Sequence, residues 1–555
     1  MFKKAITMII STIMTLSFVY STNITATYME ENFDHEVVTY SFANLPQQVD
    51  LSTSPCFPPI GYQGNFGSCV AWATTYYQYS YEVNKLNNVT DIADQEIYSP
   101  YFVYNLNNGG RDQGIHEYQA YKTLENLGCL KLKDFNRDSY RVWPKVDTND
   151  MRENLIEALK TRLVGNDKVS IPNNRNISSP SNLTANNIPL SNVKSLLNDG
   201  KVLVVGTKGY FNSAESDGEC IAYRCYSETG ESGHELTIVG YDNNLSYDVN
   251  GNGKIEPCEK GAFKVANSWG EHFNQNGIFS NNGYFWVMYD ALNLNSTNTY
   301  NNWESSYNTT RYPAFSSSNS SNDSNDFHYI TVDHKKVNLI GELKIEIDKK
   351  YGMDVYYNVR TGSQTSYTIT NQTLLTPYCY ETETQTSYFN SSIIFDFGNY
   401  VDDMEHYWNG YNYFVKISTD SSAKLHKTSF RLLDDRGNII ADYNENNIPN
   451  QPSNSYLAKS MNLQLGDLNY DSILSENDAT FLMNILVGNN SPSNLQYALA
   501  DCNQDGIVDI SDVLSIRNSL SATSNLNELD LMIQTYTSEN NIDISAISTN
   551  KIINK

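Results

Sequence analysis

Hydrophobic and polar positions change their period along the chain, and each change marks a predicted module. Between residues 45 and 300, apolar runs of strand length alternate with stretches of helical period. From 327 to 447, apolar and polar residues alternate in short runs separated by turn residues, as in LIGELKIEI and YNYFVKIST. This pattern predicts an all-β module of the sandwich type. Within 465–522 a polar loop followed by an amphipathic helix occurs twice, about 34 positions apart.

Polar stretches separate these modules. PAFSSSNSSNDSND (313–326) has the composition of a flexible linker, a second linker is predicted over 448–464, and a polar tail covers 523–555. The chain opens with two lysines and an apolar run shorter than the roughly 20 residues that span a bilayer. We interpret 1–26 as a signal peptide, with a short membrane anchor as the alternative, and 27–44 as a short N-terminal segment.

Composition narrows the functional class without deciding it. The chain has 555 residues and a formal net charge of −25, which argues against nucleic acid as a partner because phosphate binding needs clustered Lys and Arg. No later segment is apolar enough to span a membrane, so we expect a secreted, extracellular mature protein. Eight cysteines are too few for a disulfide scaffold in a chain of this length.

The stretch GYQGNFGSCVAWATTYYQYSYE carries the first candidate chemistry. A glycine-rich loop ends at Ser68, a candidate N-cap, and the pattern predicts a helix that begins at Cys69. The positive end of the helix dipole lowers the pKa of a thiol at this position and favours the reactive thiolate. Backbone N–H groups there, with the side chain of Gln63, are suited to stabilising an oxyanion.

Two further stretches supply partners for the thiol. His234 opens the apolar run LTIVGY in ESGHELTIVGYD, and Asn267 follows a predicted strand in GAFKVANSWGEHFN. An amide that binds one imidazole nitrogen fixes the tautomer, so Cys, His and Asn form the parts of a nucleophile, base and orienting group. Each residue alone is more often structural. Occurring in order, each inside an extended motif, they favour catalysis.

These motifs resemble those of the papain-like cysteine peptidases, over roughly 45–300. The resemblance implies a two-lobed α+β catalytic domain that hydrolyses peptide bonds through Cys69, His234 and Asn267, with Gln63 as an oxyanion donor. It also implies that Gly109 and Gly110 bind the substrate backbone. The chain departs from the family at Phe66, where a disulfide cysteine is usual, and at Val70, where Trp is usual.

Three stretches have the oxygen spacing of a twelve-position calcium loop, with donors at positions 1, 3, 5, 7, 9 and 12. They lie at 248–259, 467–478 and 501–512, and we expect one Ca²⁺ in the first domain and two in the C-terminal module. Chance spacing in an Asn-rich chain is the alternative for the first loop. The candidate ligands are Asp248, Asn250, Asn252, Lys254, Glu256 and Glu259 in the first loop, Asp467, Asn469, Asp471, Ile473 and Asp478 in the second, and Asp501, Asn503, Asp505, Ile507 and Asp512 in the third.

The duplicated loop and helix within 465–522 resemble dockerin domains. That resemblance implies a small α-helical module whose partner is the cohesin module of a scaffold protein. A generic EF-hand sensor is the alternative, and it needs a helix before each loop, which the sequence does not predict. For the single loop at 248–259 we expect a structural role, holding the strands that present His234 and Asn267.

Together these patterns predict a multidomain, secreted cysteine endopeptidase that acts on proteins or peptides. It would be attached to a cellulosome-type scaffold through a calcium-dependent dockerin. The alternative is a catalytically inert papain-like protein that binds rather than cleaves while displayed on the scaffold.

Overall fold

The fold follows from a computed structural model of the chain. The residues that it describes are 45–108, 112–136, 149–172, 188–207, 210–227, 233–249, 251–292, 310–312, 314–315, 324–347, 353–361, 389–397, 411–419, 425–445, 454–460 and 464–520. The predicted signal peptide, the segment 27–44 and the tail 523–555 lie outside them. None of the described helices is both long and apolar enough to cross a membrane.

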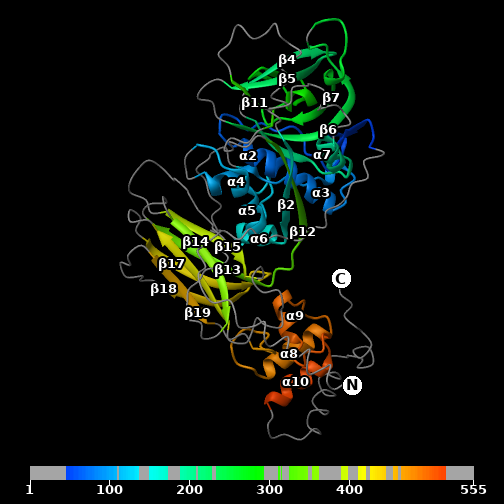
Figure 1. Cartoon of the computed structure of the whole chain (residues 1–555). Helices are drawn as coiled ribbons and strands as arrows, with labels where there is room; N and C mark the ends of the chain where they lie inside the picture. Colours follow the sequence, from blue (N-terminus) through cyan, green and yellow to red (C-terminus); the bar gives the residue numbers. More distant parts are fainter. Residues whose placement is uncertain are drawn as a thin grey trace, which may run out of the picture. The chain divides into compact units, whose positions relative to one another are not determined.

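The first domain combines a group of helices with a large sheet (Figure 1). Its first helical segment runs without a break from 69 to 86, because α2, the π-helix η3 and α3 follow one another directly. Single turns of 3-10 helix lie at Leu51–Thr53, Ile92–Asp94, Pro257–Glu259 and Tyr289–Leu292. The longer helices are α2 (Cys69–Ala71), η3 (Trp72–Tyr79), α3 (Ser80–Leu86), α4 (Pro100–Asn107), α5 (Glu117–Leu127), α6 (Asn149–Leu159) and α7 (Ile188–Asn198).

The sheet of this domain has ten strands within the described residues, eight of them in the order β11-β5-β10-β7-β6-β3-β12-β2. Strand β1 pairs with β6, β4 pairs with β5, and β8 and β9 form a separate hairpin. The strands are β1 (Gln48–Asp50), β2 (Thr161–Pro172), β3 (Leu203–Thr207), β4 (Tyr210–Ser216), β5 (Glu219–Ser227), β6 (His234–Ser246), β7 (Lys260–Ala266), β8 (Phe273–Gln275), β9 (Ile278–Ser280), β10 (Tyr284–Met288), β11 (Thr310–Tyr312) and β12 (Ser324–His334).

Strand β12 departs from the predicted domain boundaries. It begins inside the segment predicted as a linker, 313–326, and pairs along its length with β2, although its residues from 327 onward were expected to belong to the β-rich module. Figure 1 shows the two long strands side by side. Ala314 and Phe315 of the same segment are fully buried. Residues after 300 therefore complete the sheet of the first domain.

The β-rich module consists of two antiparallel sheets, with strand orders β15-β13-β17-β18 and β14-β16-β19. Val355 and Val415 of the second sheet and Leu343 and Phe430 of the first are fully buried, as the inward-facing residues of a sandwich are. Strand β19 lies within the predicted linker 448–464. The strands are β13 (Leu339–Ile347), β14 (Met353–Thr361), β15 (Phe389–Asp396), β16 (Tyr411–Thr419), β17 (Leu425–Asp434), β18 (Ile439–Glu445) and β19 (Asn454–Ser460).

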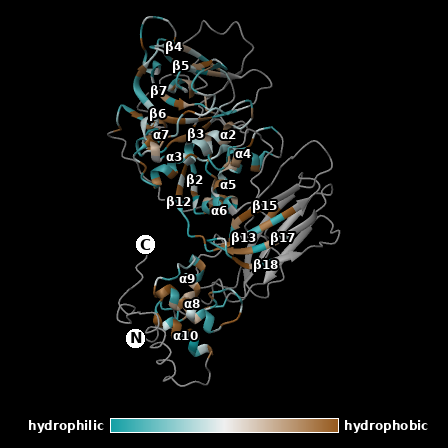
Figure 2. Cartoon of the chain, turned by 180° about the vertical axis from the view of Figure 1, so that it is seen from behind, coloured by the Kyte–Doolittle hydropathy of each residue, from teal (hydrophilic) through white to brown (hydrophobic). Residues whose placement is uncertain are grey.

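The C-terminal module contains three described helices, α8 (Glu476–Leu486), α9 (Asn494–Ala500) and α10 (Ile510–Leu520). Hydrophobic and hydrophilic residues alternate along them in Figure 2, and their apolar faces pack around Leu482, Leu499 and Val513, all fully buried. Helix α9 ends directly before the loop 501–512. The expectation that no helix precedes either loop was therefore wrong for the second loop of this module.

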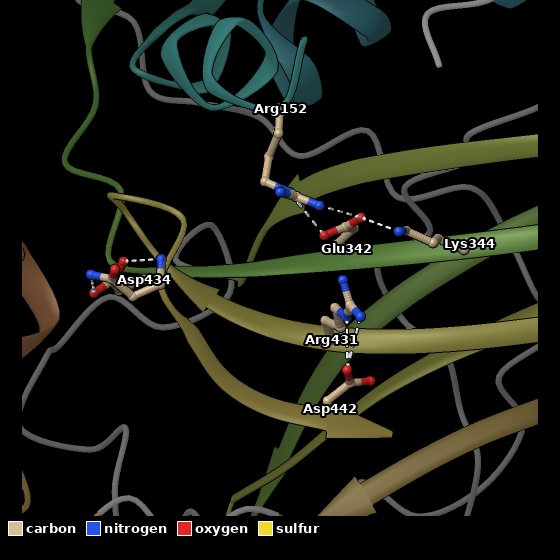
Figure 3. Close-up of polar contacts among 7 residues, drawn as sticks. Arg152, Glu342, Lys344, Arg431, Asp434 and Asp442 are labelled. Atoms are coloured by element: carbon tan, nitrogen blue, oxygen red, sulfur yellow. Dashed lines mark hydrogen bonds and ion pairs between the residues drawn. The ribbon is translucent and has the colours of Figure 1, made fainter. Parts of the chain in front are cut away.

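Buried charges connect the first domain to the β-rich module. The Arg152 guanidinium of α6 contacts the buried Glu342 carboxylate of β13, with Nε 3.2 Å from Oε2, and Lys344 approaches the same carboxylate at 3.4 Å (Figure 3). Deeper in the contact, Nη2 of Arg162 on β2 lies 2.7 Å from Oδ2 of Asp396 on β15. Both of these side chains are almost fully buried, so each charge depends on the other for compensation.

All six cysteines whose side chains the structure describes are free thiols: Cys56, Cys69, Cys129, Cys220, Cys225 and Cys502. The described part of the chain is therefore held by packing, hydrogen bonds and ion pairs.

We expect Asp396→Asn to destabilise the contact between the first domain and the β-rich module. It leaves Arg162 buried beside a neutral amide, and removal of one partner of a buried pair typically costs about 3–5 kcal/mol. Urea unfolding followed by tryptophan fluorescence measures the change. Asp442→Asn is the matched control, because the Arg431–Asp442 pair is partly exposed (Figure 3) and should contribute less than about 1 kcal/mol. Equal effects of the two substitutions would contradict this account.

Candidate active site

Cys69 is the first residue of the long helical segment that begins with α2. The helix starts there because the backbone carbonyl of Ser68 accepts the N–H of Trp72 at 3.1 Å. The Ser68 hydroxyl is buried, makes no capping hydrogen bond and has no other partner, so the side-chain cap expected from the sequence does not form. The first N–H groups of the helix have no intrahelical partner and are available at the thiol.

His234 and Asn267 come together because β6 and β7 pair in an antiparallel register, with Thr237 opposite Ala266. His234 opens β6 and Asn267 directly follows β7, so both lie at the same edge of the sheet. Nε2 of His234 is 2.9 Å from Oδ1 of Asn267.

A second hydrogen bond fixes which end of the Asn267 amide faces the imidazole. The backbone N–H of Ser268 donates to the same Oδ1 atom at 2.8 Å, so this atom must be the oxygen. Because an amide oxygen only accepts, Nε2 of His234 carries a proton and donates it. Nδ1 of the neutral imidazole is then left as the basic atom.

Neighbouring side chains hold this pair in place. The Trp269 ring stacks on the His234 ring, with centroids 4.6 Å apart and an angle of 21° between the planes. The Tyr77 hydroxyl donates to the carbonyl of Asn267 at 2.8 Å. The amide nitrogen of Asn267 is buried without a hydrogen-bond partner. The imidazole is thus shielded from water on one face.

Gln63 is tied to the same corner of the site. Its Oε1 accepts the hydroxyl of Ser268 at 2.5 Å, and its Nε2 donates to the carbonyl of Phe66 at 2.8 Å. One Nε2 hydrogen satisfies that carbonyl, which leaves the second for another acceptor.

A cavity of about 560 Å³ joins Cys69 and His234. Its wall is built from four parts of the chain: the start of α2, the segment between α4 and α5, the end of β3 and the start of β6. The described lining residues include three carboxylic acids, Asp112, Glu117 and Glu235, and no Lys or Arg. Gln63 and Asn267 do not line this cavity. Gly109 and Gly110, expected to bind the substrate backbone, lie outside the described residues.

The electrostatics differ from the expectation for a thiol at a helix N-terminus. Burial raises the pKa of Cys69, and this effect exceeds the opposing effect of backbone hydrogen bonds from Glu235, Val70 and Cys69 itself. Burial likewise lowers the pKa of His234 to about 4, although its hydrogen bond to Asn267 acts in the opposite direction. In the free protein the two groups therefore rest as a neutral thiol and a neutral imidazole.

Sequence reasoning missed all three carboxylic acids that line the cavity, Asp112, Glu117 and Glu235. Glu235 follows His234 in the motif and was treated only as part of it, whereas Glu117 lies at the start of α5, far from any motif. The side chain of Glu235 forms a hydrogen bond with that of Glu117 inside the cavity. An acidic residue next to a candidate catalytic histidine was the one signal available in the sequence.

The three predicted calcium loops share one backbone conformation. In each, positions 4 and 6 are left-handed: Gly251 (φ 67°) and Gly253 (79°), Tyr470 (63°) and Ser472 (65°), Gln504 (60°) and Gly506 (82°). In each, the first carboxylate accepts the backbone N–H groups of positions 5 and 6, and the last accepts that of position 9. The acceptors are Asp248 and Glu259, Asp467 and Asp478, and Asp501 and Asp512.

The structure describes all the other predicted ligands except Asn250. Asn252, Asn469 and Asn503 turn their amide oxygens to backbone N–H groups of their own loops. Among the described residues, no group of three or more His, Cys, Asp and Glu side chains is gathered closely enough to hold a metal ion. The predicted ligand sets also include Asn side chains and the carbonyls of Lys254, Ile473 and Ile507, which such a group does not count.

The loop 248–259 lies at the far end of its hairpin from the candidate site. It connects β6 to β7 beyond the pair Ser246–Lys260, whereas His234 is the first residue of β6. A strand advances about 3.3 Å per residue, so some 12 residues separate the loop from His234 by roughly 40 Å. The expected support for His234 and Asn267 can therefore act only through the pairing of the two strands.

Comparison with known proteins adds only distant likenesses. No protein-family model matches the chain, and no curated protein matches it. Among solved structures, it is similar to xylellain, a cysteine protease from Xylella fastidiosa, with 18% identity and a TM-score of 0.32 over 52% of this chain and 87% of that one. It is also similar to the bromelain protease from Ananas comosus, with 17% identity and a TM-score of 0.30 over 52% of this chain and 99% of that one. Likenesses of this extent decide neither the fold nor the activity of the chain.

We expect the His234 imidazole to remain uncharged until the pH falls to about 4, below the 6.5 of an unperturbed histidine. The unfolded chain takes up this proton near pH 6.5 and the folded chain near 4, so the folded state loses stability as the pH falls through this window. Nuclear magnetic resonance titration of histidine rings in Cys69→Ala, where no thiol proton can move to the imidazole, measures the value. Asn267→Ala should lower it further. A midpoint at or above 6.5 would contradict the assignment.

Proposed function

We propose that the first domain is a cysteine peptidase that hydrolyses peptide bonds of protein or peptide substrates, as its resemblance to papain-like enzymes implies. The observation that carries this proposal is the hydrogen bond between His234 Nε2 and Asn267 Oδ1. It leaves Nδ1 as a base on the same cavity as the Cys69 thiol. A partly buried imidazole with a fixed tautomer, on the same cavity as a thiol, is the arrangement that nucleophilic catalysis needs.

The reaction begins from the neutral pair. Nδ1 of His234 removes the thiol proton of Cys69 as the sulfur attacks the carbonyl carbon of the substrate, forming a carbon–sulfur bond. The developing oxyanion is held by the backbone N–H of Cys69 and by the second Nε2 hydrogen of Gln63. The imidazolium then protonates the leaving amine as the peptide bond breaks, which gives a thioester.

The thioester is hydrolysed by water, which now acts as the nucleophile, while the sulfur of Cys69 is the leaving group. His234 removes a proton from water, which attacks the thioester carbonyl, and the proton returns to the sulfur of Cys69 as the acid leaves. The imidazole is positively charged only while a tetrahedral intermediate is present. Stacking by Trp269 excludes water and therefore raises the cost of charging the imidazole at any other time.

We expect Cys69→Ala to lower hydrolysis of an unfolded protein, such as reduced casein, by more than about 10³-fold, because no other group can form the acyl intermediate. Activity is measured by release of acid-soluble peptides. The inert-binder alternative is tested with a thiol-directed epoxide inhibitor, which should label the unsubstituted protein and not Cys69→Ala. Casein hydrolysis that survives the substitution would refute the peptidase assignment.

The C-terminal module has a second proposed role, attachment to a scaffold protein by a calcium-dependent, dockerin-like contact with a cohesin. Its support is the shared conformation of the loops 467–478 and 501–512. Burial and the charges of neighbouring carboxylates raise the pKa values of Asp467 and Asp512, so a bound cation would relieve carboxylates that repel one another. Secretion of the whole chain belongs to the same proposal.

The ligands proposed for the ions are those that the calcium-loop pattern assigns. In the third loop, Asp501, Asn503, Asp505 and Asp512 would contribute side-chain oxygens, and Ile507 its carbonyl. Ser472 of the second loop adopts the left-handed conformation that glycine adopts at this position in the other two. That conformation is strained for a residue with a side chain, so the second loop should bind more weakly than the third.

We expect three calcium ions per chain in calorimetric titration of the full-length protein, and one fewer in Asp248→Ala and in Asp501→Ala. Calcium at a hundred times its dissociation constant stabilises a binding module by about 2.7 kcal/mol, so melting of the affected module should shift. Asp333→Ala, at an exposed position on β12, is the control and should retain three ions. Unchanged stoichiometry in both loop variants would overturn the calcium assignment.

A further inference from the structure

Asp112, Glu117 and Glu235 form an acidic wall of the cavity beside Cys69, and the reaction described above gives this wall no role. Its central residue is Glu235, which lies on β6 directly after His234. Because successive side chains of a strand point to opposite faces, Glu235 points away from the side that carries His234 and Asn267. Its side chain contacts that of Glu117, the first residue of α5, and both residues line the cavity.

The carboxyl group of Glu235 is not fully satisfied. The residue is only 7% exposed, and apart from the contact with Glu117 its buried Oε2 atom has no hydrogen-bond partner. A buried polar atom in this state is unfavourable, and native structures seldom keep one without a role. A ligand that donates a hydrogen bond inside the cavity would satisfy it.

The negative charge of the acidic wall indicates which charge the ligand should carry. Burial and the neighbouring charge of Glu117 raise the pKa of Glu235, so the two carboxyl groups hold one proton between them and a single negative charge. No described lining residue is a lysine or arginine that could balance this charge. A cationic donor would allow both groups to ionise, and a guanidinium could bond to both at once.

The acidic wall adjoins the proposed nucleophile, which indicates that the ligand is a part of the substrate. The backbone N–H of Glu235 is close enough to the Cys69 sulfur to favour its thiolate form, and both residues line the cavity. A side chain of a peptide lying across Cys69 therefore reaches the two carboxyl groups directly. With a volume of about 560 Å³, the cavity has ample room for one long side chain.

We propose that this cavity selects a basic side chain, arginine or lysine, of the peptide substrate, and that Glu235 together with Glu117 determines this specificity. The inference rests on the proposed peptidase function and adds the substrate class. The competing explanation is that the paired acids only join α5 to β6, in which case the cavity distinguishes size and not charge.

The test measures binding without turnover. Fluorescent peptides of alanine and glycine carry either arginine or citrulline, its neutral analogue of the same shape, at one of four successive positions. Their affinity for the full-length Cys69→Ala variant is measured by fluorescence anisotropy. At one position, arginine should bind ten- to a hundredfold more tightly than citrulline, because a charged hydrogen bond to a buried carboxylate is lost in the neutral peptide.

Variants locate the preference. Glu235→Gln in the Cys69→Ala background should reduce the ratio of the two affinities to less than threefold, and Glu117→Gln should also reduce it. Glu125→Gln is the control, since this residue lies on the same helix but is exposed and pairs with Lys122, and the ratio should not change. A ratio near one at every position, no binding of any peptide, or a ratio unaffected by Glu235→Gln would each overturn the inference.

Failure of the peptidase assignment has a different signature. If the chain with Cys69 intact hydrolyses none of the peptides while Cys69→Ala still prefers arginine, the cavity binds basic peptides and the catalytic proposal falls. If hydrolysis occurs with equal kcat/KM for arginine and citrulline peptides, the catalytic proposal stands and the specificity falls.

Discussion

The register between β6 and β7 is the constraint on which the candidate site depends. His234 and Asn267 belong to different strands, and their hydrogen bond exists only because Thr237 lies opposite Ala266. A shift of one residue would turn His234 to the other face of the sheet and bring Glu235 to its place. The strands on both sides, β3 and β10, and the burial of their apolar residues oppose such a shift. The fold thus contributes to catalysis mainly by fixing the register between β6 and β7.

Burial sets the electrostatic state of the same site. A helix N-terminus stabilises a thiolate, but the partial removal of a thiol from water disfavours it, and the second effect is the larger one for Cys69. The same desolvation keeps His234 neutral, so that it can accept a proton from the sulfur only when substrate is in position. The resting thiol is therefore a weaker nucleophile than a thiolate, and it reacts with reagents that, like a substrate, bind beside His234. The thiolate and the imidazolium form only when the oxyanion can also bind its hydrogen-bond donors.

Sequence reasoning found features that local spacing encodes and missed those that depend on contacts between distant segments. Cys69, His234 and Asn267 could be identified because each lies in a motif with its own local structure. Glu117 could not, since its meeting with Glu235 depends on how α5 packs against β6. Strand β12 has the alternation of any half-buried strand, and nothing in that pattern reveals that β2 is its partner. The thiol pKa was misjudged for a related reason, because burial is a property of the folded chain.

Two successive residues of β6 connect substrate recognition to the nucleophile. The imidazole of His234 binds the orienting amide, Glu235 lines the cavity, and the backbone N–H between them favours the thiolate of Cys69. In the free protein the Glu117–Glu235 pair carries a single negative charge, and the charge of Glu117 adds to the effect of burial in raising the pKa of Cys69. A cation bound between the two carboxyl groups would release their shared proton, so the pair would gain one negative charge as the cation brings one positive charge. A basic substrate would thus leave the net charge beside the sulfur unchanged, and its preference would act through binding and not through the reactivity of the thiol.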